Sequence, residues 1–271
     1  MASPSLDAIA PVPPPGAHWP HPGAIRSPQG REICLWLVNL AQSPPAEAQA
    51  RALLSEDERE QADRFVFARD RRRYTIGRAT LRVLLGEATG GPPQLLQFTY
   101  GPQKKPSLST GSAWFNLSNS GDLALIGVTQ LGELGVDLEV PRSLLDGPGL
   151  ARSMFSLAEQ AALASFPSEH WTTAFFRCWT RKEAYVKAIG DGLSAPLERF
   201  TVSLGPIAQL ERLDGSQAAA ARWTLIDERP ASGVVAAAIA IEATDVVVHR
   251  YTCPPSVRNS GHTDCAQESP V

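Results

Sequence analysis

The sequence predicts an α+β fold made of two similar α/β lobes that are related by pseudo-twofold symmetry. Three observations support this prediction. Each half of the chain contains a Ser-x-x-Glu capping box, Ser55 with Glu58 and Ser156 with Glu159. Each box lies between a short apolar strand and a long helix, and one offset of 101 residues (55 to 156) aligns the boxes, the strands and the helices. This period is too long for a solenoid and favours two lobes with a ligand groove between them.

The first half begins with an apolar strand over 33–40, which a polar link with Pro44 and Pro45 follows. After the capping box, apolar residues at helical spacing predict a helix over 71–87. The segment Gly90-Gly91-Pro92-Pro93 ends this helix. Short strands are expected over three further segments: 95–100, 114–117 and 123–129.

The second half repeats this order, with a strand over 134–140 and a helix over 171–189 that Gly190 ends. Further strands are expected over four segments: 200–204, 222–226, 234–241 and 246–251. Because only a few residues separate the two halves, lobes in contact are favoured over independent domains on a linker.

Proline marks the ends of the chain. Eight of the 23 prolines fall in residues 1–30 and three in 254–271, so the body between them has an ordinary proline content. We therefore expect four segments: a proline-rich disordered tail (1–30), an N-terminal lobe (31–131), a C-terminal lobe (132–253) and a flexible tail (254–271).

The charge balance excludes several classes of partner. A net charge of −3 argues against a protein dedicated to nucleic acid or to membrane surfaces. The longest apolar run, from Gly233 to Ile241, is too short to cross a bilayer, and no signal peptide is visible. A cytoplasmic protein with reduced cysteines is expected.

The 101-residue offset pairs carboxylates of the second half with non-acidic residues of the first: Asp137 with Trp36, Glu139 with Val38, and Glu183 with Arg82. Side chains alternate along a strand, so Asp137 and Glu139 point to the face opposite Val136 and Leu138. Two carboxylates about 7 Å apart on one face can share a divalent cation. For this strand alone, an ordinary solvated polar face is the alternative.

The helix over 171–189 adds to this pattern. Trp179, Glu183 and Lys187 recur at i, i+4 and i+8 and therefore share one face. Taken alone, Glu183 and Lys187 form an ordinary surface pair. Together with the strand they make a cluster of three carboxylates with a lysine one turn away, which suits Mg²⁺ and the phosphate groups that it binds.

The first half carries complementary charge, with seven arginines and one acid between Arg64 and Arg82. Arg73 flanks the apolar face of its helix and can turn toward the groove, whereas Arg71, Arg78 and Arg82 form a separate stripe. One or two of these arginines are candidate phosphate ligands. The alternative is a solvated basic helix face, which is expected for most of them.

The segment Trp114–Gly121 runs from a strand into a polar turn. Ser118, Asn119 and Ser120 offer hydroxyl, amide and backbone donors there, a candidate contact for phosphate or base. A plain Ser/Asn turn that leads to Gly121 is the alternative. The sequence contains no P-loop, no dinucleotide-binding fingerprint and no nucleophile elbow.

Two motifs, Gly135-Val136-Asp137-Leu138-Glu139 and Trp179-Thr180-Arg181-Lys182-Glu183-Ala184-Tyr185-Val186-Lys187, resemble those of the 4′-phosphopantetheinyl transferase superfamily. The resemblance is to the two-lobed monomeric type that activates surfactin synthetase and related synthases. Weaker matches follow the family's order: Lys105-Pro106, Phe115-Asn116-Leu117-Ser118 and Gly192-Leu193-Ser194-Ala195-Pro196-Leu197. The resemblance covers roughly 31–251.

The resemblance implies transfer of the phosphopantetheinyl arm of coenzyme A to a serine of an acyl or peptidyl carrier protein, with release of adenosine 3′,5′-bisphosphate. Three residues would hold Mg²⁺ or Mn²⁺: Asp137, Glu139 and Glu183. Glu183 would also act as the base for the serine hydroxyl, and Lys187 would neutralise charge on the pyrophosphate. Coenzyme A would be bound by Arg73, Lys105, Ser118, Asn119 and Lys187. Nucleic acid and membrane are not implied as partners.

The sequence departs from the family at the polar turn, which usually reads Phe-Asn-x-Ser-His-Ser. Asn119 stands at the histidine position and brings no positive charge to the 3′-phosphate. Glu58 and Gln61 stand near positions where relatives often carry lysine. A catalytically weakened homologue that only binds carrier proteins is therefore a second hypothesis, and an arginine-based nucleic-acid binder is a third, which the net charge disfavours.

Overall fold

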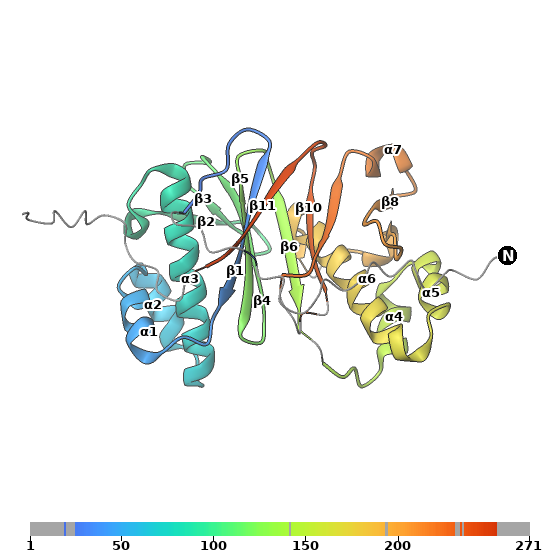
Figure 1. Ribbon diagram of the computed structural model, residues 1–271, viewed down its shortest axis with the longest axis horizontal. Coiled ribbons are helices and arrows are strands. Elements are labelled where there is room, and N and C mark those ends of the chain that lie inside the picture. Colours follow the sequence, from blue (N-terminus) through green and yellow to red (C-terminus); the bar gives the residue numbers. More distant parts are fainter. Residues whose placement is uncertain are drawn as a thin grey trace, which may run out of the picture.

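The first sheet lies at the centre of the molecule, beside three helices (Figure 1). Its strand order is β11-β1-β5-β4, with bounds Val247–Thr252, Glu32–Asn39, Leu123–Thr129 and Trp114–Ser120. All neighbours are antiparallel except β11, which runs parallel to β1. The helices are α1 (Pro44–Arg51), α2 (Glu56–Asp63) and α3 (Ala68–Thr89). A 3₁₀ turn at Pro93–Leu95 leads to the hairpin of β2 (Phe98–Tyr100) and β3 (Pro106–Leu108). We call this set the first lobe.

The second sheet has the order β6-β10-β9, with bounds Leu134–Glu139, Ala236–Ile241 and Thr224–Glu228. Its helices are α4 (Gly147–Met154), α5 (Leu157–Ala164) and α6 (Ser168–Ile189). A 3₁₀ turn at Leu197–Arg199, the pair β7 (Phe200–Val202) and β8 (Leu210–Leu213), and α7 (Gln217–Ala220) complete it. We call this set the second lobe.

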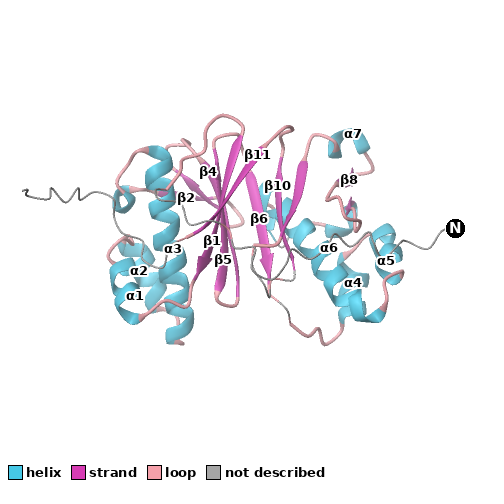
Figure 2. Cartoon of the chain, viewed as in Figure 1, coloured by secondary structure: helices cyan, strands magenta, loops and turns pink. Residues whose placement is uncertain are grey.

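The two sheets face each other and the long helices cover their outer sides (Figure 2). Three apolar clusters hold these layers together. One packs Trp36 of β1 against α3, one packs Phe176 of α6 with its neighbours in the second lobe, and the third joins the sheets through Leu35, Val136 and Ile239. Alternate residues of β1 therefore enter different cores, whereas β6 places only every second residue in a core, the one between the sheets.

The structure is a computed structural model, and it describes residue 19 and residues 25–140, 142–192, 195–230, 234 and 236–253. Most of the predicted tail 1–30, all of the predicted tail 254–271, and Leu193 and Ser194 of the weaker motif lie outside these residues. Trp19, within the first of these segments, is buried in the cluster between the sheets, and its carbonyl accepts a hydrogen bond from Thr252.

The structure confirms the predicted α+β class with two similar lobes. Each lobe has one strand, a capping box, a 22-residue helix and two antiparallel strands in the same order. Two differences from expectation change the architecture. Pro44 and Pro45 open α1 instead of forming a link, because proline is tolerated in the first turn of a helix. The strand expected over 246–251 belongs to the sheet of the first lobe, although it follows the second in the chain.

The alignment of the long helices also needs a correction. Both helices end at a glycine in the left-handed conformation, Gly90 and Gly190, so the helices are related by 100 residues and not by 101. Arg82 therefore corresponds to Lys182, and the first-lobe counterpart of Glu183 is Val83. The capping boxes keep the 101-residue offset, so one residue is absorbed between box and helix.

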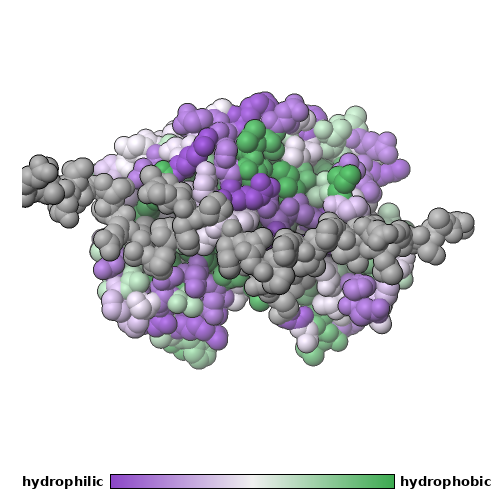
Figure 3. Space-filling view, in the orientation of Figure 1, coloured by the Kyte–Doolittle hydropathy of each residue, from purple (hydrophilic) through white to green (hydrophobic). Residues whose placement is uncertain are grey.

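Figure 3 shows a mostly hydrophilic face, with apolar side chains gathered in its upper middle, over the sheets. In the part of the chain that the structure describes, no helix is long and apolar enough to cross a membrane.

Candidate active site

The carboxylates of β6 point toward α6, on the side of the strand opposite the core between the sheets. Asp137 and Glu139 are both buried, at 4% and 7% exposure, while Val136 and Leu138 fill the core between the sheets. The predicted alternation along this strand is therefore confirmed. Two buried carboxylates on one face repel each other unless cations or donors balance them.

Strand β4 lies beside β6 and supplies hydroxyl and amide groups. The Ser118 hydroxyl donates to Asp137 Oδ1 at 2.9 Å, and the Ser120 hydroxyl donates to Glu139 Oε2 at 3.1 Å. The side-chain oxygen of Asn116 accepts from the backbone N–H of Val136 at 2.9 Å. Every second residue of β4 thus faces β6.

Two cations balance these carboxylates. Lys187 Nζ lies 2.5 Å from Asp137 Oδ1 and 2.9 Å from the Ser118 hydroxyl. Arg142 forms a bidentate pair with Glu139, with N–O distances of 2.8 and 3.0 Å. The sequence motifs pointed to Lys187 but not to Arg142, although its place three residues after Glu139 was a usable signal.

Helix α6 lies directly on β6 because Gly135 leaves room for it. A Cβ atom at this position would overlap the carbonyl oxygen of Ala184 and the backbone nitrogen of Ala188. This close approach brings Glu183 near the strand. Burial, and then the negative charges of Asp137 and Glu139, raise the pKa of Glu183 above its usual range, while Lys187 opposes the shift.

The carboxylate oxygens of this site are chemically suited to bind a hard divalent cation. Asp137 Oδ2 is buried without a hydrogen-bond partner, and Glu183 makes no hydrogen bond or ion pair with any described residue. The carboxylate oxygens of Asp137 and Glu183 are ligands of the kind that Mg²⁺ prefers. Within the described ranges, however, no three His, Cys, Asp or Glu side chains are gathered closely enough to hold a metal ion, and Lys187 and Arg142 stand beside the carboxylates.

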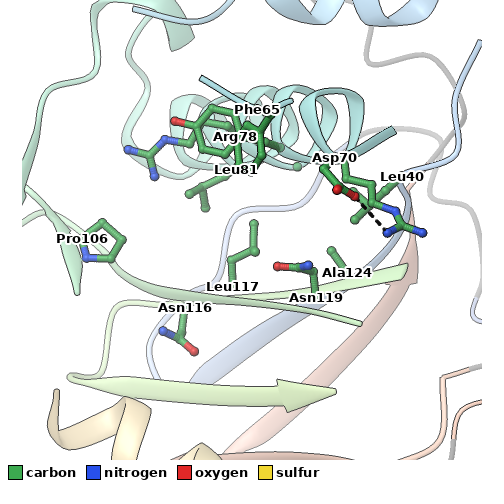
Figure 4. Close-up of a pocket in the computed structure, with 13 residues that line it drawn as sticks. Leu40, Phe65, Asp70, Arg78, Leu81, Pro106, Asn116, Leu117, Asn119 and Ala124 are labelled. Atoms are coloured by element: carbon green, nitrogen blue, oxygen red, sulfur yellow. Dashed lines mark hydrogen bonds and ion pairs between the residues drawn. The ribbon is translucent and has the colours of Figure 1, made fainter. Parts of the chain in front are cut away.

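A cavity of about 460 Å³ lies on the other side of β4, beneath α3 (Figure 4). Apolar side chains such as Leu81 and Leu117 line its middle. Arg73, Arg78 and Asn119 supply polar groups, and Figure 4 shows Asn119 beside Ala124 and the guanidinium of Arg78 toward Pro106. The cavity thus combines an apolar lining with two arginine side chains.

The two arginines of the cavity are held by different carboxylates. Arg73 binds Asp122 at 2.7 Å and Asp70 at 3.4 Å, and Asp70 also lines the cavity. Arg78 pairs with Glu58, donates to the Tyr100 hydroxyl at 3.0 Å and stacks over Phe98.

Glu58 is shared by Arg78 and Arg82, so two guanidinium groups stand against one carboxylate. Burial by itself raises the pKa of Glu58, but the hydrogen bonds and charges of the two arginines outweigh it and hold the pKa below its usual range. The described residues offer no acceptor to Arg78 Nη1. The excess positive charge therefore lies at the cavity wall, where an anion can use it.

Lys105 lies between the lobes, at the end of α6. Its ammonium group pairs with Glu133 and donates to the carbonyl of Ala188 at 2.8 Å. A cation is favourable at a helix C-terminus, and this one stands next to Pro106 of the cavity wall.

Two family models match the chain along most of its length. One, described as the 4′-phosphopantetheinyl transferase superfamily, matches residues 133–240, and the other, described as the N-terminal part of 4′-phosphopantetheinyl transferase, matches residues 43–130. The chain belongs to the 4′-phosphopantetheinyl transferase superfamily. The family inferred from the two motifs is thus confirmed, and the chain is an enzyme of this type.

Similar curated transferases come from distant organisms. The 4′-phosphopantetheinyl transferase HetI of Nostoc sp. (strain PCC 7120) is 39% identical over 210 residues, which are 76% of this chain and 86% of that protein. The transferase psf-1 of Bacillus pumilus is 33% identical over 162 residues, 59% and 68% of the two chains. The L-aminoadipate-semialdehyde dehydrogenase-phosphopantetheinyl transferase of Homo sapiens is 31% identical over 166 residues, 56% and 53%. These comparisons do not support a homologue without catalytic activity.

The structure of this transferase separates two residues that the sequence placed together. Ser118 and Asn119 lie within β4, not in a turn, because β4 pairs with β5 as far as Ser120. Their side chains therefore point in opposite directions, Ser118 to Asp137 and Asn119 to the cavity. The turn begins at Gly121, whose φ of +59° suits glycine.

Arg78 is a residue that the sequence interpretation assigned to the wrong group. It was expected in a stripe separate from Arg73, but both line the same cavity because the long side chain of Arg78 reaches back over Phe98. The excess of arginine over acid in this helix was the signal for it. Arg82, by contrast, is buried and has no access to the cavity.

Proposed function

We propose that this transferase moves the 4′-phosphopantetheinyl group of coenzyme A to a serine of acyl or peptidyl carrier proteins that serve polyketide and non-ribosomal peptide synthases. The observation that carries the proposal is the three carboxylates of β6 and α6 with Lys187, separated only by β4 from a cavity with two arginines. Charge-stabilising groups next to a pocket for a ring and phosphates are what phosphoryl transfer needs.

Asp137, Glu139 and Glu183 would hold Mg²⁺ or Mn²⁺, after Lys187 and Arg142 move from the carboxylates. When bound, the ion neutralises charge on the pyrophosphate. Glu183 accepts the proton of the serine hydroxyl. The serine oxygen forms a bond to the phosphorus of the phosphopantetheinyl group, and the bond to adenosine 3′,5′-bisphosphate breaks. Lys187 stabilises the charge that develops on the leaving phosphate.

The cavity beneath α3 would take the adenosine end of coenzyme A. Its apolar middle suits the base, and Arg73 and Arg78 at its two ends suit phosphates. Lys105 would bind a phosphate at the boundary between the lobes, and Ser118 would contact the reacting pyrophosphate from β4. Asn119 would contribute a neutral hydrogen bond.

We further propose a monomeric cytoplasmic enzyme that has no nucleic-acid or membrane partner. The lobe boundaries 31–131 and 132–253 are part of the same proposal. β11 (Val247–Thr252) lies within 132–253 but packs on the first sheet, so these bounds divide the sequence and not the packed units.

Mass spectrometry of an apo carrier protein tests the proposal. After incubation with the enzyme, coenzyme A and Mg²⁺, the carrier is expected to gain one phosphopantetheinyl group, and EDTA is expected to prevent the gain. Asp137→Ala should abolish it with the fold intact. If no acyl or peptidyl carrier gains mass, the proposal fails.

Asn119→His tests how the adenosine end is recognised. We expect the variant to lower the KM for coenzyme A but not that for dephospho-coenzyme A, because histidine adds charge that only the 3′-phosphate can use. Arg78→Gln should have the opposite effect. Unchanged selectivity in both variants would contradict a 3′-phosphate at this end of the cavity.

A further inference from the structure

Lys182 lies next to Glu183 in the longest motif of the sequence, yet the structure places it on the opposite side of α6 from the carboxylates. We propose that Lys182 is a positioning residue. Its ion pair with the capping-box glutamate Glu159 fixes the position of α6, and this position brings Glu183 and Lys187 to the reacting groups. The activity part of this inference depends on the proposed function.

The contacts of Lys182 are complete. Its ammonium group donates to Glu159 Oε1 at 2.7 Å, to Glu159 Oε2 at 2.8 Å and to the carbonyl of Phe200 at 2.7 Å. A lysine has three N–H donors, so none remains for a substrate. The side chain is 0% exposed, which also keeps it from coenzyme A and from a carrier protein.

Glu159 is held equally firmly. Its carboxylate accepts from the backbone N–H groups of Ser156 and Val202, both at 2.7 Å, and is 0% exposed. The pair therefore joins three elements, the start of α5, the middle of α6 and β7. Because both partners are buried and saturated, α6 has no second low-energy position against this group.

The opposite side of α6 touches β6 through Gly135, where the backbones are already at close contact. The helix is thus fixed from two sides, by Lys182 on the outside and by β6 on the inside. Glu183 is one residue after Lys182 in α6, and Lys187 is five residues after it. A rotation or slide of α6 therefore moves both Glu183 and Lys187 relative to Asp137. A displacement of about 1 Å in a reacting group can cost on the order of 10²-fold in rate.

The test compares Lys182→Met with the double variant Glu159→Gln/Lys182→Met in carrier modification. The single variant leaves Glu159 buried without its cation, and we expect kcat to fall on the order of 10²-fold. The KM for coenzyme A should stay within about threefold, because no substrate contact is lost. The double variant removes the stranded charge, and kcat should recover at least about tenfold.

Arg82→Met in the first lobe is the matched control, because Arg82 closes the equivalent capping box there. It is expected to lower stability and to raise the KM for coenzyme A, because Glu58 then neutralises Arg78 at the cavity, while kcat at saturating coenzyme A stays within about threefold of wild type. Wild-type kcat in Lys182→Met would overturn the inference. A double variant as slow as the single variant would also overturn it, since a lysine that acts on substrate cannot be replaced by removing Glu159. If the single variant does not fold, the kcat of the double variant relative to wild type tests the inference: a loss on the order of 10²-fold would overturn it.

Hydrogen exchange provides a readout that needs no activity. Amides of 183–187 should exchange at least tenfold faster in Lys182→Met than in wild type, and not in Arg82→Met. Equal protection in all three proteins would overturn the inference. If the wild type modifies no carrier at all, the proposed function fails, but the exchange experiment still tests the position of α6.

Discussion

The two lobes build the same capping box and close it with different cations. In the first lobe, Arg82 donates to Glu58, to the Ser55 hydroxyl and to the carbonyls of Pro93 and Leu96. In the second, Lys182 donates two protons to Glu159 and the third to the carbonyl of Phe200. Glu58 also accepts Arg78, so the first box carries excess positive charge at a cavity, whereas the second is neutral and closed. The duplicated capping box thus supplies positive charge at a cavity in the first lobe, and it holds the long helix in position in the second.

The strands beneath the long helices also differ, because the strand of the first lobe carries apolar side chains where the strand of the second carries functional groups. Trp36 of β1 fills the core under α3, while its counterpart Asp137 of β6 is a candidate catalytic group. Cys34 fits beneath α3, but its counterpart Gly135 must lack a side chain because α6 lies closer to its strand. The second lobe therefore combines acidic groups with a tighter helix contact than the first.

The sharpest test of this division is Glu183→Gln. We expect kcat to fall about 10²- to 10⁴-fold, the range for loss of a general base. The free energy of unfolding should stay equal or rise by about 0.5–1 kcal/mol, because a carboxylate is removed from a like-charged group. Carrier modification and chemical denaturation measure the two quantities.

Val83→Ala, at the equivalent position of α3, is the control and should do the reverse. It should cost about 1–2 kcal/mol of stability and leave kcat unchanged. A large loss of stability in Glu183→Gln would show that the second-lobe carboxylates support the fold.

Gly135→Ala should have the next largest effect. The added methyl group must push α6 off β6, so we expect a loss of about 1–3 kcal/mol in stability and on the order of tenfold or more in kcat. Cys34→Ala, the counterpart in β1, should cost less stability and no activity. Equal effects of the two variants on kcat would contradict the tighter contact in the second lobe.

Arg82→Lys tests why the two boxes use different cations. Lysine cannot reach Glu58, Ser55 and both carbonyls at once, so we expect a loss of about 1–3 kcal/mol, measured by urea denaturation. Wild-type stability would show that the extra bonds of Arg82 contribute nothing.

Cysteine alkylation should show the smallest difference between the lobes. Burial raises the pKa of Cys34 to about 11 and that of Cys178 well above its usual value, so neither thiol should react in the native protein at pH 8. With rising urea both should become reactive together, because the core between the sheets couples the lobes. Earlier labelling of Cys34 would show that the first lobe opens separately.

Patterns that depend on near neighbours could be predicted from the sequence. The alternation of Asp137 with Val136, the two capping boxes and the ends of the long helices at Gly90 and Gly190 all follow from local geometry. The helical spacing of Glu183 and Lys187 also placed both on the face of the helix toward Asp137.

Features that depend on distant partners could not be predicted. Ser118 and Asn119 are in a strand because β5 pairs with them, and Arg78 lies at the cavity with contacts to Glu58, Tyr100 and Phe98, which are all distant in sequence. The one-residue shift between capping box and helix lies in a loop. A loop has no repeating pattern of apolar residues, so the sequence gives no signal of the shift. The partner of β11 is set by packing against β1, 215 positions earlier at the Glu32–Val247 pair (247 − 32).

This parallel pair of β1 and β11 has a consequence for synthesis of the chain. The first lobe is translated first, but its sheet lacks a strand until every element of the second lobe has emerged from the ribosome. Pairing between strands so far apart in sequence is slow, since a large loop must close before any contact forms. During this interval one side of β1 is an unprotected sheet edge, the kind of surface that a chaperone covers or that pairs with another nascent chain.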